Sequence, residues 1–164
     1  MTLSHHSMES LRPAEIEEAG GELHRRIAVA LRAIGERRAD RPDAERRSPR
    51  MRVAQLAAAV ELAAQVLAAV AAGTPPPAAR VDRHPVLQAA VLNGAPTLPA
   101  LSQRLEQDRR ILASLARSLE SRLDEEHETP WGAVSLRRML AEVSIAEAAA
   151  CAFELERSAA TADS

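Results

Sequence analysis

Apolar side chains recur along most of this chain at the spacing of helices that pack along one face. In residues 98–119 the leucines follow each other at steps of three and four, except for one step of seven. This period is typical of a helix that is buried along a single stripe. Similar stripes predict long helices over residues 13–38, 50–72, 98–126 and 133–158, and a short helix over residues 85–93. We therefore predict an all-α fold, a four-helix bundle with an additional short crossover helix.

Prolines, glycines and one threonine mark the predicted helix ends. Pro13 opens the first helix, and Thr97 is expected to cap the helix that follows it. Gly20 and Gly21 weaken the first helix by roughly 1 kcal/mol each. The breaks between the later helices fall at Gly73, residues 75–77, Pro130 and Gly132. We expect one domain over residues 13–160, with flexible tails at 1–12 and 161–164.

The second predicted helix is apolar on most of its sides. Gln55, Glu61 and Gln65 share one face, so we interpret it as a buried amphipathic helix and not as a membrane span. The apolar sides of this helix must be buried against other parts of the structure, for example against a second subunit.

The last predicted helix has a core stripe that ends in the only phenylalanine of the chain. Cys151 falls on the opposite side of this helix and is expected to be partly exposed. The stripe consists of Leu136, Met139, Val143, Ala146, Ala150 and Phe153.

Composition narrows the class of protein. The chain has 164 residues, of which 46% are hydrophobic and only 1% aromatic, which favours helices over strands. The formal net charge of −2 argues against a nucleic-acid binder.

Every basic residue is arginine, which indicates a GC-rich genome. We interpret the local cluster of Arg46, Arg47, Arg50 and Arg52 as a solvated linker. A single cysteine and a polar N-terminal segment lead us to expect a cytoplasmic protein without disulfides.

The sequence carries none of the common catalytic motifs. A phosphate-binding glycine loop, a CxxC pair, an HExxH motif and a nucleophile elbow are all missing from it. We therefore expect no catalytic and no cofactor-binding residues, and we lean against an enzyme. The sequence leaves open whether a cofactor is bound.

Asp108 interrupts the leucine stripe, because it occupies the position where the step of seven leaves a gap. A carboxylate at a core position is costly unless it is paired, protonated or bound to a cation. An ion pair with an arginine of a neighbouring helix, a device that fixes helix register, and a metal or ligand site all remain open. His24, on the flank of the first stripe, is either a half-buried structural histidine or a ligand.

Two segments resemble hemerythrin-like (HHE) domains. Residues 23–34, with His24 ahead of an apolar stripe, are similar to the first helix of that family, and residues 105–112 are similar to its third helix, with Asp108 where a histidine is usual. The resemblance implies a helical bundle with a di-iron centre, for which this chain offers His24, Asp108, Glu147 and Glu154. The second and fourth helices lack histidine, so the resemblance implies a degenerate site.

These observations lead to a main hypothesis and two alternatives. The main hypothesis is a non-catalytic helical bundle that binds a protein partner or forms a homo-oligomer, without nucleic acid or membrane. The first alternative is a degenerate hemerythrin-like bundle that binds iron or a small ligand through His24, Asp108, Glu147 and Glu154. The second is a regulatory domain that senses a ligand for DNA binding, although no helix-turn-helix is evident.

Overall fold

Helices make up most of the structure, a computed structural model that describes residues 11–42 and 46–161. The long helices are α2 (Pro13–Ile34), α3 (Pro49–Ala71) and α5 (Leu98–Ser118). A fourth rod joins α6 (Leu136–Ala141), the π-helical segment η4 (Glu142–Glu147) and α7 (Ala148–Ala160). The short elements are α4 (Pro85–Gly94), the 3₁₀ turns η1 (Glu36–Arg38), η2 (Val81–Arg83) and η3 (Glu120–Arg122), and the strands β1 (Glu126–Thr129) and β2 (Gly132–Ser135). The predicted helical class is confirmed, and the predicted tails fall mostly outside the described residues.

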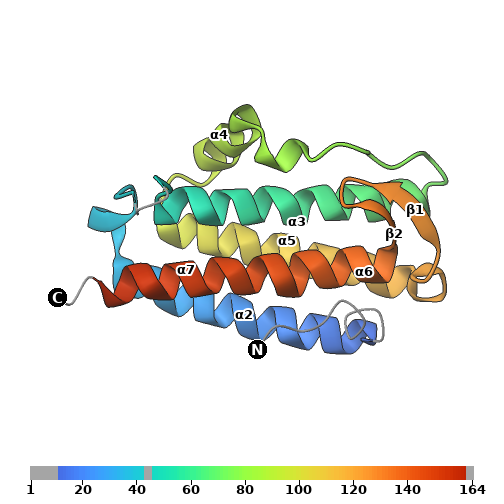
Figure 1. The fold of residues 1–164 in the computed structure, drawn as a ribbon, viewed down its shortest axis with the longest axis horizontal. Helices are drawn as coiled ribbons and strands as arrows, with labels where there is room; N and C mark the ends of the chain where they lie inside the picture. Colours follow the sequence, from blue (N-terminus) through green and yellow to red (C-terminus); the bar gives the residue numbers. More distant parts are fainter. Residues whose placement is uncertain (1–10, 43–45, 162–164) are drawn as a thin grey trace.

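Helices α3 and α5 lie side by side and run in the same direction (Figure 1). At their starts, Arg50 Nη1 donates a hydrogen bond to the carbonyl oxygen of Pro96. Past their ends, Arg122 Nη1 donates to the carbonyl oxygen of Val70 over 3.0 Å. A helix of 23 residues is about 34 Å long, so the connection between two parallel helices must return over that whole distance. Residues 72–97 form this return, and α4 and η2 lie on it (Figure 1).

The returning segment covers the outer side of α3. Thirteen of the 23 residues of α3 are buried, between α5 and α7 on one side and η2 and α4 on the other. The apolar sides of α3 are thus buried by other segments of the same chain. By length and composition, α3 is the one described helix that could cross a membrane, but 67% of its most apolar window is buried inside the fold, as expected of a core helix.

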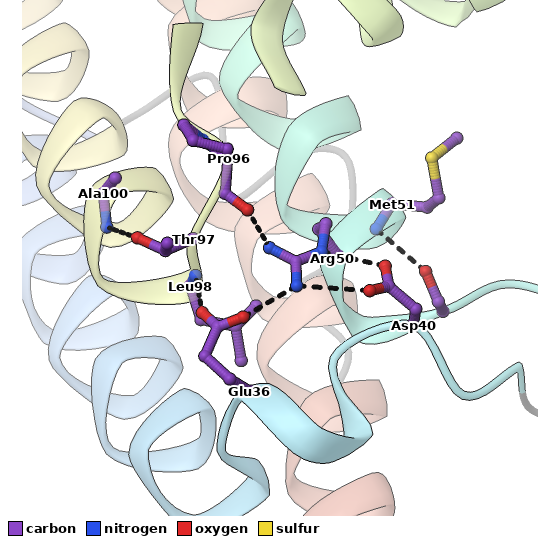
Figure 2. Close-up of polar contacts among 9 residues, drawn as sticks. Glu36, Asp40, Arg50, Met51, Pro96, Thr97, Leu98 and Ala100 are labelled. Carbon is purple, nitrogen blue, oxygen red and sulfur yellow. Dashed lines mark hydrogen bonds and ion pairs between the residues drawn. The ribbon is translucent and has the colours of Figure 1, made fainter. Parts of the chain in front are cut away.

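Arg50 ties the starts of α3 and α5 to the end of α2 (Figure 2). Its side chain is only 13% exposed, with Nε 2.8 Å from Asp40 Oδ1 and Nη2 2.7 Å from Glu36 Oε2. The other oxygen of Glu36 accepts a hydrogen bond from the backbone N–H of Leu98. Bonds of this kind, to partners on several segments, fix how the helix ends meet. In the same view, Thr97 Oγ1 accepts from the N–H of Ala100, as predicted for a cap.

The interpretation of the arginine cluster as a solvated linker is wrong for two of its members. The side chains of Arg50 and Arg52 are 13% and 9% exposed, because acidic partners on other elements reach them. A local charge pattern cannot reveal partners that are distant in the sequence.

Helix α5 ends at Ser118, well before the predicted boundary at Glu126, and a β-hairpin follows. The leucine spacing continues to Leu123, which is fully buried but lies outside the helix, so the spacing alone extends the helix too far. In the hairpin turn, Thr129 Oγ1 accepts from the N–H of Trp131 and donates to the carbonyl oxygen of Gly132. Gly132 has φ +98°, a conformation that favours glycine. Strands of four residues are too short for a clear alternation of polar and apolar side chains.

The π-helical segment η4 shifts the buried face of the last rod. The predicted stripe is correct up to Val143, but Ala150 and Phe153 are exposed, Phe153 by 56%. Cys151 is buried, against our expectation. A π-helical turn adds one residue, about 100° of rotation, to the 3.6-residue period. The buried residues beyond it are therefore Ala148, Cys151, Ala152 and Leu155.

Gly20 and Gly21 form a matched pair in α2. A Cβ at Gly20 would lie 3.2 Å from the carbonyl oxygen of Ser144, whereas at Gly21 its nearest neighbour would be Arg109 Nη1 at 3.8 Å. We expect Gly21→Ala to raise the free energy of unfolding by about 0.5–1 kcal/mol through helix propensity. Gly20→Ala should gain less or destabilise, because α2 and η4 must move apart. Urea denaturation of both variants tests this, and an equal gain would contradict the close approach.

Candidate functional site

Asp108 faces a second carboxylate, Glu61 of α3. Its side chain is 15% exposed, and its Oδ2 atom is buried and has no hydrogen-bond partner among the described residues. Arg104, one turn earlier in α5, places Nε 2.8 Å from Glu61 Oε1 and 3.7 Å from Asp108 Oδ2. The expected partner was an arginine of a neighbouring helix. Instead the arginine comes from the same helix, and the neighbouring helix supplies another acid.

This environment raises the pKa of Asp108 to about 7. Burial, which disfavours the charged carboxylate, is the main cause, followed by the negative charge of Glu61 and a hydrogen bond with it, while Arg104 opposes the shift. Near neutral pH the Asp108 carboxyl group is therefore protonated for part of the time. The pair is held by Arg104, whose Nη1 also donates to the carbonyl oxygen of Val91 in α4 over 3.4 Å.

His24 lies between α2 and α5, and its side chain is 12% exposed. Its Nε2 is 3.4 Å from Glu106 Oε2, while Nδ1 is buried without a hydrogen-bond partner among the described residues. Burial is the largest cause that lowers the pKa of His24, with Glu106 opposing it. Hydrogen bonds from Arg109 and Arg110 lower the pKa of Glu106 to about 2. At neutral pH the imidazole is therefore uncharged beside a permanent carboxylate, which agrees with a half-buried structural histidine.

A groove runs from His24 along the contact of α2 and α5. Its volume is about 570 Å³, and its lining includes Glu36 and Leu98, which are hydrogen-bonded to each other (Figure 2). Its apolar lining includes Leu31 and Pro99. Glu36 and Glu106 are both bonded to arginines, so the groove carries no uncompensated charge that would attract a metal.

Glu147 belongs to a separate cluster at the hairpin end of the fold. Its Oε1 is 2.9 Å from Arg80 Nη2 and accepts a hydrogen bond of 3.0 Å from the indole Nε1 of Trp131. Arg80 also stacks on the Trp131 ring at 4.6 Å and forms two hydrogen bonds with the buried Asp82. These contacts join the returning segment, the hairpin and η4.

Glu154 pairs with arginines. Its carboxylate is 3.2 Å from Arg157 Nη1 and 3.8 Å from Arg52 Nη2. Cys151 lies nearby, and burial raises its pKa to about 12. A thiol with so high a pKa is protonated at neutral pH and is a poor nucleophile or metal ligand.

The four residues offered for a metal are therefore not assembled into one set. His24 pairs with Glu106, whereas Asp108 lies beside Arg104, so the two belong to different clusters. Neither shares a partner with Glu147 or Glu154, which line one small hollow with Cys151. Across residues 11–42 and 46–161, no group of three or more His, Cys, Asp or Glu side chains is placed to hold a metal ion. The side chains of the described residues do not fit a di-iron centre.

Comparison with protein-family profiles, with curated proteins and with solved structures yields no match to this chain.

The raised pKa of Asp108 predicts a pH-dependent stability. The unfolded chain releases this proton near pH 4, but the folded protein keeps it up to about pH 7. Ionisation of Asp108 therefore opposes folding. The contribution of Asp108 to the free energy of unfolding of the wild type falls as the pH rises from about 4 to about 7. We expect Asp108→Asn to be more stable than the wild type near pH 8 by up to about 4 kcal/mol, which is about 1.4 kcal/mol for each pH unit between the two pKa values, and to lose this advantage near pH 4. Urea denaturation across this range, with the exposed Glu120→Gln as control, measures the difference. Equal pH slopes for Asp108→Asn and the wild type would contradict the raised pKa of Asp108.

Proposed function

We propose that this chain is a non-catalytic helical module that recognises a protein surface, and that a second copy of the chain is the partner that it binds through α4. The architecture that we propose for the module is a four-helix bundle of α2, α3, α5 and the α6–α7 rod, with α4 as the crossover helix.

The observation that carries this proposal is the apolar outward face of α4. The helix buries Gln88 and Val91, and the Gln88 amide donates to the backbone carbonyl of Asp82 over 3.3 Å. It exposes Val86 by 66% and Leu87 by 39%. Surface helices ordinarily carry polar residues on the outward face. An apolar outward face of this kind is typical of an interaction surface.

A second copy of the chain suits this face because α4 carries no charged residue. In a two-fold contact each residue meets the same surface of the partner, so like charges near the axis would repel. Ala89 and Ala90 are exposed beside Val86 and Leu87 and allow a close approach of two helices. A helix of ten residues is about 15 Å long and falls short of the roughly 800 Å² per partner that stable interfaces bury. We therefore expect a weak dimer whose population depends on concentration.

The chemistry of the interior supports a non-catalytic role. His24, Asp108, Glu147 and Glu154 each lie within 4 Å of a charged group of the same chain. The single thiol, Cys151, is buried and protonated. Glu147 and Glu154 hold separate segments together through Arg80, Trp131 and Arg52.

A substitution on α4 tests the proposed interface. We expect sedimentation velocity to show that the wild type associates as its concentration rises, and that Val86→Glu stays monomeric. Glu in the first turn of α4 is favourable for the helix itself, so the fold should persist. Val29→Glu is the matched control, because Val29 is 57% exposed on α2.

Three results would contradict this proposal. One is a wild type that remains monomeric at every concentration. The others are association that survives Val86→Glu, and association that Val29→Glu weakens equally.

A further inference from the structure

Two adjoining hollows lie between the start of α3, η2 and the last rod. Their volumes are about 360 Å³ and about 170 Å³, and both are lined by Arg47, Gln55 and Arg83. Met51 and Gln88 complete the larger one, and Arg52 lines the smaller one. We call the two together the arginine hollow.

Three arginines from different parts of the chain line the arginine hollow. Arg47 precedes α3, Arg52 lies in its first turns, and Arg83 belongs to η2 on the returning segment. Arg52 is 9% exposed, so this cation is built into the wall. The exposed Arg83 side chain forms no hydrogen bond or ion pair with any residue of the described part of the chain. Two carboxamides, from Gln55 and Gln88, add uncharged polar groups.

The acids near the arginine hollow are already paired. Glu147, in the wall of the smaller part, is bonded by Arg80 and Trp131, and Glu154 pairs with Arg157 and with Arg52 of the same wall, at 3.8 Å. Among the described residues, the lining of the larger part contains Arg47 and Arg83 and no acidic side chain. In a chain with a formal net charge of −2, the described lining of the larger part is thus positively charged.

We propose that the arginine hollow binds a small phosphate-bearing molecule. Guanidinium groups present paired N–H donors that match phosphate oxygens, and groups converging from several directions suit an anion with several oxygens. A volume of about 360 Å³ lies within the range of small-molecule sites. This site goes beyond the proposed function, because the interface on α4 needs no ligand.

Binding would also join parts of the fold. An anion between Arg83 and Arg47 bridges the returning segment to the start of α3. Because only the folded chain brings these arginines together, the ligand stabilises the fold by mass action.

Calorimetric titration of the full chain with inorganic pyrophosphate tests this proposal. The titration is made at physiological ionic strength, which screens diffuse attraction between exposed charges. We expect saturable binding that Arg83→Ala weakens about tenfold. Arg37→Ala removes the same charge from another exposed site, in η1, and should leave the affinity within about twofold of the wild type.

Two outcomes would overturn the proposal. One is the absence of saturable pyrophosphate binding to the wild type. The other is an equal loss of affinity in Arg83→Ala and Arg37→Ala, which would show that only net charge matters. Neither outcome bears on the association through α4, which is measured without ligand.

Discussion

The parallel packing of α3 against α5 is the constraint on which the rest of this structure depends. Two neighbouring helices that run in the same direction cannot be joined by a short turn, so the chain returns along their full length (Figure 1). The return covers the outer side of α3, which is too apolar to face water. It also places α4 outside, with Val86 and Leu87 exposed, and brings Arg83 to the start of α3. The proposed interface and the proposed anion site both follow from this single connection.

Ionic contacts hold the return in place at three points. Arg50 binds the segment before α5 at one end of the fold, and Arg80, with Asp82, Trp131 and Glu147, holds η2 against the last rod. Arg104 bonds the end of α4 while it compensates Glu61 and Asp108. The Asp82 side chain is fully buried, so removal of Arg80 would leave an uncompensated buried charge, which is strongly destabilising. Glu147, which looks like a metal ligand in the sequence, is used here as a structural partner of Arg80.

The sequence predicts the helices where packing is regular and fails where it is not. The stripes of α2 and α3 are buried as their period predicts, and Thr97 caps α5. The hairpin is missed because its strands are short and because Leu123 extends the helical spacing beyond the helix. The buried face of α7 is misassigned because a π-helical turn leaves no mark in the apolar pattern before it. At the candidate sites, the conflict at Asp108 and the partial burial of His24 are visible in the sequence, but Glu61 as the partner of Asp108 is not, since it lies on another helix.

The return between the parallel helices α3 and α5 produces the outward face of α4, which we propose as the recognition surface of this chain. Amide hydrogen exchange of the wild type at low and high protein concentration tests this proposal most directly, because exchange reports local opening segment by segment. Our account predicts that residues 81–94 exchange more slowly at high concentration, while α2 exchanges at the same rate in both samples. Exchange in residues 81–94 that does not change with concentration, or protection that appears on α2 instead, would contradict it.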